Sequence, residues 1–175
     1  MVLRPARAED LPVMAEVFLA AWRVGYRGMV PDELIDALDG ATAQAELVNG
    51  ANALDRQTTV LLDAAGTVAG FVRYGADHGG PGGYLASLYV HPSASGRGGG
   101  RLLLRHAVDA MPGVDVTLWV FEANARARNL YQRAGFRADG ARQTEPRWQA
   151  AQVRLRRPPT NRARPLPPIP EIELP

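Results

Sequence analysis

The sequence predicts one mixed α/β domain, in which helices flank a single sheet. Three observations predict it: an amphipathic helical run near the N-terminus, a series of β-rich runs through the middle of the chain, and a strand that leads through a glycine-rich loop into a helix. The 175 residues suffice for one domain with a core, and 46% of them are hydrophobic. Chains of this size and composition are typically globular.

Helices are predicted where apolar residues recur at helical spacing. Val13, Val17 and Val24 share one face of a helix expected over 10–25. A short helix opens at Pro31-Asp32-Glu33, because its two acids lie near the positive end of the helix dipole. Further helices are expected over the ranges 41–49, 98–110 and 124–134.

Strands are predicted where β-branched and aromatic residues cluster between turn residues. The expected strands are Val2–Arg7, Thr58–Asp63, Val68–Tyr74, Tyr84–His91, Val114–Phe121, 136–141 and 148–155. A turn at 64–66 joins two of them into a hairpin, and five glycines between 75 and 83 mark a loop. We expect the domain over 1–156. The proline-rich residues 157–175 are expected to form an extended tail against their own domain or a neighbouring subunit, which allows for a homodimer.

Charge divides the chain. Residues 1–96 contain 6 Arg and 11 acids, whereas residues 97–164 contain 14 Arg and 5 acids, and there is no Lys. A basic half can face nucleic acid, a membrane or a phosphorylated cofactor. No apolar run is long enough for a membrane span or a secretory signal, so we expect a cytoplasmic protein without a membrane partner.

The composition also limits the chemistry. Cysteine is absent, which excludes disulfides, thiolate nucleophiles and cysteine-based metal sites. His78, His91 and His106 have no metal-site spacing, so no metal is expected.

A glycine-rich loop follows the strand at 84–91. Gly96, Gly98, Gly99 and Gly100 leave backbone N–H groups uncovered, the following helix N-terminus adds partial positive charge, and Arg97 and Arg101 add full charges. This combination is typical of a pyrophosphate site, although such loops can also be simple flexible connections. A P-loop is excluded because it needs Lys, and a Rossmann fingerprint would need glycine where Arg101 or Leu103 stands.

The segment 124–136 supports a ligand site. Asn124 and Tyr131 are two helical turns apart and share a face, and Ala127 between them is small enough for a ligand chain to pass.

Together the two segments resemble the cofactor-binding core of the GNAT superfamily of acyl-CoA-dependent N-acetyltransferases, in their small bacterial form. The family motif Gln/Arg-x-x-Gly-x-Gly/Ala corresponds to Ser95-x-x-Gly98-x-Gly100. The motif Asn-x-x-Ala-x-x-x-Tyr-x-x-x-Gly-Phe corresponds to residues 124–136 without a gap. Ser95 departs from the usual Gln or Arg, so we expect weaker cofactor binding or compensation by neighbouring arginines.

The resemblance covers residues 1–156 and implies a mainly antiparallel, splayed central sheet of about six to seven strands flanked by helices. It implies acetyl-CoA as the acyl donor. The implied cofactor-binding residues are Leu88, Tyr89, Val90, Ser95, Gly96, Arg97, Gly98, Gly99, Gly100, Arg101, Asn124, Ala127 and Tyr131. Among them, the backbone of residues 88–90 would hold the pantetheine arm and polarise the thioester carbonyl.

The resemblance also implies catalytic roles. Tyr131 would donate a proton to the departing sulfur, and Asn124 would contact pantetheine or an ordered water. The alternatives are a tyrosine at the core edge and an N-cap asparagine. Glu122 is the first choice as general base, although it could simply favour the helix dipole. Tyr84, Asp77 and His78 are the reserve candidates.

The acceptor site is expected near the first helix. The stretch from Trp22 to Pro31 is similar to Trp-Arg-x-x-Tyr-x-Gly-x-x-Pro in many small bacterial members of the family. Trp22 and Tyr26 would form an aromatic wall for a cationic amine, with Tyr84 nearby, or else a hydrophobic staple between helices.

We therefore expect transfer of acetyl from acetyl-CoA to a primary amine of a small molecule by direct attack in a ternary complex. A protein or peptide N-terminal amine is the alternative acceptor. A non-catalytic acyl-CoA-binding module and a nucleic-acid-binding protein are the rival classes, and we expect no nucleic-acid partner.

Overall fold

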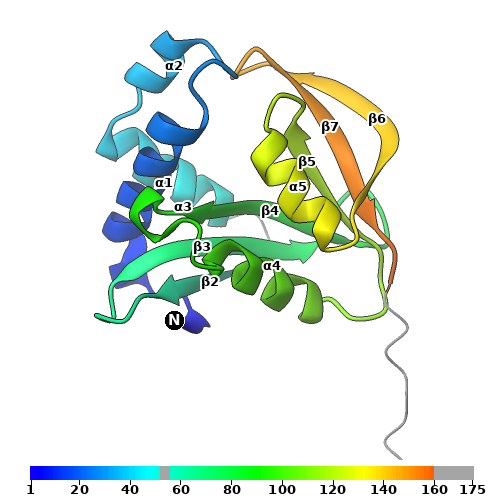
Figure 1. Cartoon of the computed structure of the whole chain (residues 1–175), viewed down its shortest axis with the longest axis horizontal. Helices are drawn as coiled ribbons and strands as arrows, with labels where there is room; N and C mark the ends of the chain where they lie inside the picture. Colours follow the sequence, from blue (N-terminus) through cyan, green and yellow to red (C-terminus); the bar gives the residue numbers. More distant parts are fainter. Residues whose placement is uncertain (52–55, 160–175) are drawn as a thin grey trace, which may run out of the picture.

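The computed structural model describes residues 1–51 and 56–159 and shows a seven-stranded mixed sheet flanked by helices (Figure 1). Its helices are α1 (Leu11–Gly25), α2 (Asp32–Asp36), α3 (Gly40–Ala51), α4 (Gly99–Asp109) and α5 (Ala125–Arg133). Its strands are β1 (Val2–Pro5), β2 (Arg56–Leu62), β3 (Val68–Ala76), β4 (Gly83–Val90), β5 (Val116–Phe121), β6 (Arg137–Glu145) and β7 (Ala150–Arg157). The predicted fold class is confirmed.

The sheet is splayed in its middle. Its strands follow the order β1-β2-β3-β4-β5-β7-β6, and each neighbouring pair is antiparallel except β4 and β5. The parallel ladder of β4 and β5 has only two register positions, Gly83 opposite Val116 and Tyr84 opposite Thr117. Beyond Tyr84, β4 stays paired with β3 and β5 stays paired with β7. The two halves of the sheet therefore diverge from this point.

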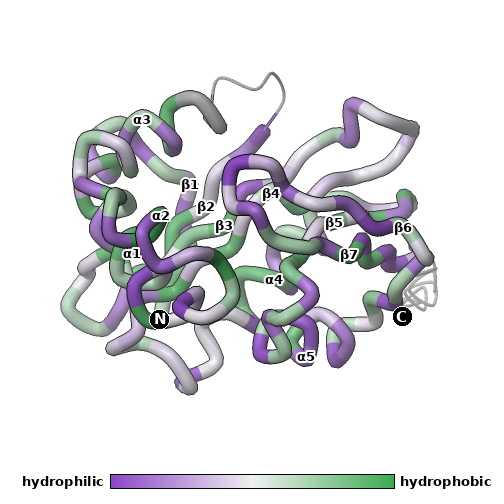
Figure 2. Tube along the Cα trace, turned by 90° about the horizontal axis from the view of Figure 1, so that it is seen from above, coloured by the Kyte–Doolittle hydropathy of each residue, from purple (hydrophilic) through white to green (hydrophobic). Residues whose placement is uncertain are grey.

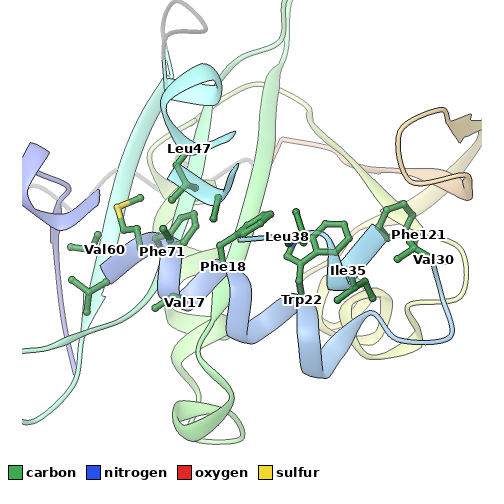
Figure 3. Packing of buried hydrophobic residues seen from close by; sticks show 14 of the residues in the cluster. Val17, Phe18, Trp22, Val30, Ile35, Leu38, Leu47, Val60, Phe71 and Phe121 are labelled. Atoms are coloured by element: carbon green, nitrogen blue, oxygen red, sulfur yellow. The ribbon is translucent and has the colours of Figure 1, made fainter. Parts of the chain in front are cut away.

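Apolar side chains form one core on each face of the sheet. The first core packs α1, α2 and α3 against the strands and includes Phe18, Trp22 and Phe71 (Figure 3). The second core lies under α4 and α5 and includes Leu104 and Tyr131. Seen from above, the central strands carry hydrophobic stretches, whereas hydrophilic stretches gather at the periphery (Figure 2). The divergence of β4 and β5 therefore has a helical layer on each side.

The predicted elements are present with shifted ends. The loop expected over 75–83 is shorter, because β3 continues to Ala76 and the N–H of Asp77 donates to the carbonyl of Gly82 at 2.8 Å. The first strand ends at Pro5 instead of Arg7, since the Arg7 N–H donates to the Asp10 carboxylate. In the last hairpin β6 runs to Glu145 and β7 to Arg157, beyond the expected ends, and the pairing of the two strands is interrupted by a register shift between Ala138 and Arg142.

Two further expectations concern the C-terminal tail and the absence of a membrane-spanning helix. Residues 160–175 of the expected proline-rich tail lie outside the described residues. Within the described ranges, none of the helices combines the length and the apolar character that crossing a membrane requires.

Candidate active site

The candidate site lies where β4 and β5 diverge. Leu88, Tyr89 and Val90 end β4, and on one side they remain in the antiparallel ladder with β3. On the side of β5 the described sheet gives them no strand partner. Side chains alternate across a strand, so Tyr89 faces α1 while Leu88 and Val90 face α4 and α5.

The glycine-rich loop connects β4 to α4 in a compact conformation. A 3-10 turn over Pro92–Ala94 comes first, and Gly96 and Gly98 then adopt left-handed φ angles of 79° and 86°. A Cβ on Gly99 would lie 2.6 Å from Cδ2 of Leu61, so glycine is what lets the first turn of α4 pack against β2. No side chain caps this N-terminus. Its first amide groups therefore remain donors at the positive end of the helix dipole.

Three side chains, two in this loop and one in the first turn of α4, were expected to help hold phosphates. Arg97 and Arg101 are exposed, and neither forms an ion pair with any residue in 1–51 or 56–159. Ser95 is half-buried, and its hydroxyl donates to the backbone carbonyl of His91 at 3.5 Å. The two guanidinium groups are thus the free charges beside the amides of α4.

Asn124 is the N-cap of α5. It is 8% exposed, and its Oδ1 accepts a hydrogen bond from the N–H of Ala127 at 3.0 Å. The N-cap interpretation is therefore correct. The side-chain NH₂ makes no hydrogen bond with any described residue, so Asn124 keeps a donor for a ligand. Ala127 packs at the edge of the second core.

Tyr131 is buried on α5, with its ring edge-on to Phe136 at a centroid distance of 5.9 Å. Burial raises the pKa of the Tyr131 hydroxyl far above its usual value, and the nearby hydroxyls of Tyr89 and Tyr84 raise it further. These two residues belong to β4, so Tyr131 lies within electrostatic reach of the diverging strands. Its hydroxyl has no hydrogen-bond partner in the described part of the chain. Tyr131 is therefore a neutral group that holds its proton at any physiological pH.

An aromatic cluster closes the wide end of the divergence on the opposite face. The Trp22 ring stacks on Tyr26 at 4.2 Å between centroids and packs against Trp148 at 4.1 Å in a tilted arrangement. Phe121 of β5 lies edge-on to both Trp22 and Tyr26. Trp22 is only 3% exposed, so it is a core residue. Tyr26 and Trp148 are half-buried and form the accessible part of the cluster. Sequence reasoning missed Trp148, whose only signal was an aromatic residue at the start of the strand expected over 148–155.

Tyr84 and Glu122, two further predicted site residues, lie apart from each other: Tyr84 in the paired part of β4 and β5, and Glu122 beside β6. Tyr84 lies where β4 still pairs with β5, and the Arg56 guanidinium lies over its ring at 5.2 Å from the centroid. Burial raises the pKa of Tyr84. The Glu122 carboxylate forms an ion pair with Arg142 of β6 at 2.9 Å. Its carboxylate is therefore engaged at the edge of the sheet.

The reserve candidates are spread around the loop between β3 and β4. The Asp77 carboxylate accepts hydrogen bonds from the Thr117 hydroxyl at 3.0 Å and from the N–H of Gly79. His78 is exposed. No group of three or more His, Asp or Glu side chains suited to a metal ion occurs among the residues that the structure describes.

The sequence model of the acetyltransferase (GNAT) family matches residues 21–136, which include Trp22, Tyr26 and Phe121 of the aromatic cluster and the whole glycine-rich loop. The chain belongs to the GNAT acetyltransferase family. It is 27% identical over 141 residues to a protein named "Probable N-acetyltransferase Rv2775" from Mycobacterium tuberculosis, and the match covers 79% of this chain and 80% of that protein.

Solved structures show the same GNAT fold. PaiA N-acetyltransferase from Thermoplasma acidophilum, crystallised with coenzyme A, superposes with a TM-score of 0.69 at 21% identity over 90% of this chain and 99% of that one. The ribosomal-protein-S18-alanine N-acetyltransferase of Escherichia coli superposes with a TM-score of 0.66 at 19% identity, over 95% and 98% of the two chains. The protein is thus an N-acetyltransferase of a family that uses acetyl-CoA.

Proposed function

We propose that this GNAT enzyme transfers an acetyl group from acetyl-CoA to the primary amine of a small molecule. The observation that carries the proposal is the early end of the β4–β5 ladder after Tyr84 and Thr117. Beyond it, backbone groups of residues 88–90 face the β5 side without a strand partner in the described sheet. Unpaired N–H and C=O groups of a strand can bind an extended chain of amides, and the pantetheine arm is such a chain.

The phosphates of acetyl-CoA are proposed to bind at the N-terminus of α4. At this N-terminus the uncapped amides, the positive end of the helix dipole and the side chains of Arg97 and Arg101 all attract negative charge. A Cβ on Gly98 would have no atom within 4 Å, so open space lies at this position for the phosphates, whereas a Cβ on Gly100 would meet the side chains of Leu88, Val90 and Leu130. Ser95, whose hydroxyl bonds to His91, is proposed to contribute less than the two arginines.

Proton transfers follow from the chemistry of the amine. An alkylamine has a pKa of about 10.4, so its neutral form costs about 4–5 kcal/mol at pH 7. As its nitrogen bonds to the acetyl carbon, the C–S bond breaks and a water molecule takes the proton that the nitrogen releases. A backbone N–H of residues 88–90 would stabilise the negative charge on the carbonyl oxygen. Tyr131 would give its proton to the leaving sulfur.

The geometry supports Tyr131 as the proton donor better than it supports Glu122 as the base. Tyr131 is neutral, buried and without a competing partner among the described residues. Glu122 is half-exposed and already paired with Arg142. Because the chain has no cysteine, a thiol-based acyl-enzyme is excluded and direct attack is the simplest route.

Thermal-shift titration with acetyl-CoA, coenzyme A and ATP tests the donor site. At about 100 times Kd, a ligand stabilises the folded state by about 2.7 kcal/mol, which raises Tm by about 5–10 °C at this size. We expect this shift with acetyl-CoA and not with ATP. No shift with acetyl-CoA would overturn the proposal.

Amine-dependent release of coenzyme A thiol tests the reaction. Small primary amines and peptides with a free N-terminus form separate arms, and we expect release with the small amines. Release with peptides alone would reassign the acceptor to a protein N-terminus. Binding of acetyl-CoA without release by any amine would favour a non-catalytic acyl-CoA-binding module.

A further inference from the structure

Arg73 of β3 is a charged residue buried inside the sheet layer, only 6% exposed. In the strand register it lies opposite Thr58 on β2 and Ser87 on β4. Its guanidinium donates a hydrogen bond to the backbone carbonyl of Leu47, near the end of α3. No carboxylate of residues 1–51 or 56–159 lies within ion-pair distance of it.

The surroundings make this charge costly to bury. Burial is the main cause that lowers the pKa of Arg73, and the charge of Arg56 adds to it, while Tyr89 and Glu46 act in the opposite direction. A guanidinium has five N–H donors, and binding the end of α3 accounts for one of them. Buried charges are usually paired with an opposite charge, and the buried Nε of Arg73 has no hydrogen-bond partner among the described residues. A structural role at α3 therefore does not account for the whole guanidinium.

Other unsatisfied polar atoms lie on the same face of the sheet. Arg73 Nε, Arg56 Nε and Ser87 Oγ are all shielded from solvent and have no hydrogen-bond partner among the described residues. Ser87 faces the same side as Arg73 because the two are register partners. Buried polar groups in proteins are nearly always hydrogen-bonded. Here two guanidinium Nε atoms and one hydroxyl have no partner. We therefore expect a ligand group at this position that accepts hydrogen bonds and carries negative charge.

This position is next to the proposed reaction centre. Ser87 immediately precedes residues 88–90, whose backbone is proposed to hold the thioester. It lies on the face of α1 and α3, whereas Tyr131 lies in the core beneath α4 and α5. Ser87 and residues 88–90 belong to the same strand, which rises about 3.3 Å per residue, so a group bound at the Ser87 hydroxyl lies within about 10 Å of that backbone.

We propose that Arg73, Ser87 and Arg56 bind an acidic group of the acceptor, so that the acceptor is a small amine with its own carboxylate, such as an amino acid. This inference rests on the proposed function and names the substrate class of the same site. At this distance the amine and the acidic group can belong to the same small molecule. A peptide N-terminus does not fit, because its nearest carbonyl is a neutral amide.

The test compares matched acceptors in thiol release by the full-length protein. Each amino acid of a panel is assayed beside its carboxamide and its decarboxylated amine, which share the reacting group but lack the negative charge. The wild type should prefer the carboxylate by about 30-fold or more in kcat/KM, mainly through KM, as expected for a buried charge pair.

Two variants assign the preference to these residues. Arg73→Lys keeps the charge but loses the planar fork that pairs with carboxylates, and Ser87→Ala removes the unpaired hydroxyl. Both should lower the preference for the carboxylate while leaving the Kd of acetyl-CoA unchanged. Val72→Ala is the matched control, because Val72 neighbours Arg73 on β3 but is buried in the core under α4. It should cost stability without changing the preference.

Each outcome decides the inference. If the wild type acetylates each amino acid and its uncharged analogues at equal rates, the inference is overturned. The proposed function still stands in that case, provided that acetyl-CoA binds. A preference unchanged in both Arg73→Lys and Ser87→Ala would also overturn it. If Arg73→Lys does not fold, Ser87→Ala carries the assignment. Failure of the wild type to bind acetyl-CoA would overturn the proposed function and the inference together.

Discussion

The indole N–H of Trp22 donates a hydrogen bond to the hydroxyl of Tyr89, with 3.3 Å between nitrogen and oxygen. This bond links α1 to β4. The Tyr89 ring also packs against Phe18 and Phe71, at centroid distances of 5.2 and 5.4 Å. The side chain of Tyr89 therefore belongs to the core under α1, while its backbone lies where β4 has left β5.

Tyr89→Phe separates these two roles. The change removes one partly buried hydrogen bond, so it should lower the free energy of unfolding by about 1 kcal/mol, as measured by urea denaturation. The Kd of acetyl-CoA should not change, because the backbone groups proposed to bind it are retained. A rise of more than tenfold in this Kd would show that the hydroxyl itself contributes to donor binding.

Local patterns explain which features could be predicted from the sequence. The helix over 10–25, the glycine-rich loop and the Asn124–Tyr131 face depend on residues close together in the chain, and the structure contains all of them. Features that depend on distant pairing could not be predicted in this way. The insertion of β7 between β5 and β6 and the ion pair of Glu122 with Arg142 are of this kind.

The burial of Arg73 near the candidate site also could not be predicted from local sequence patterns. It stands in a predicted strand between apolar residues, where nothing local separates it from an exposed arginine. Its burial and its hydrogen bond to the carbonyl of Leu47 arise from tertiary packing, and the strand register places Ser87 beside it. Trp148 likewise reaches Trp22 through tertiary packing alone.

Tyr131→Phe tests the proton donor. Loss of a general acid should lower kcat by about 100-fold or more while leaving the Kd of acetyl-CoA unchanged. Tyr74→Phe is the matched control, because Tyr74 is a buried tyrosine whose hydroxyl lies 3.1 Å from His106 Nε2, outside the proposed site. An unchanged kcat in Tyr131→Phe would remove the residue from the mechanism.

The pH dependence of kcat gives an independent test of Tyr131. Because burial raises its pKa, the hydroxyl keeps its proton below that raised value and loses it only at higher pH. The wild-type rate should therefore rise as the amine loses its proton and should show no decline up to about pH 10, the usual pKa of tyrosine. A decline near pH 10 that disappears in Tyr131→Phe would show that the hydroxyl titrates in the ordinary range of tyrosine, about 10.

Glu122→Gln and Arg142→Gln test the base as a pair. If the carboxylate serves only the ion pair, both variants should lose the same small stability, within about 1 kcal/mol for a surface pair, and both should keep the wild-type kcat. Steady-state thiol release and urea denaturation measure the two quantities. A kcat more than tenfold lower in Glu122→Gln, with Arg142→Gln unaffected, would restore Glu122 as the general base.

Gly98→Ala tests the loop at α4, and Gly113→Ala is its control. Both glycines have left-handed φ angles, 86° and 75°, and no atom lies within 4 Å of a Cβ built on either. Alanine in this conformation costs about 1–2 kcal/mol, so the two variants should lose similar stability in urea denaturation. Only Gly98→Ala should raise the Kd of acetyl-CoA, because its methyl group would enter the open space before α4 where the phosphates are proposed to bind. Equal Kd values in the two variants would mean that the phosphates bind elsewhere.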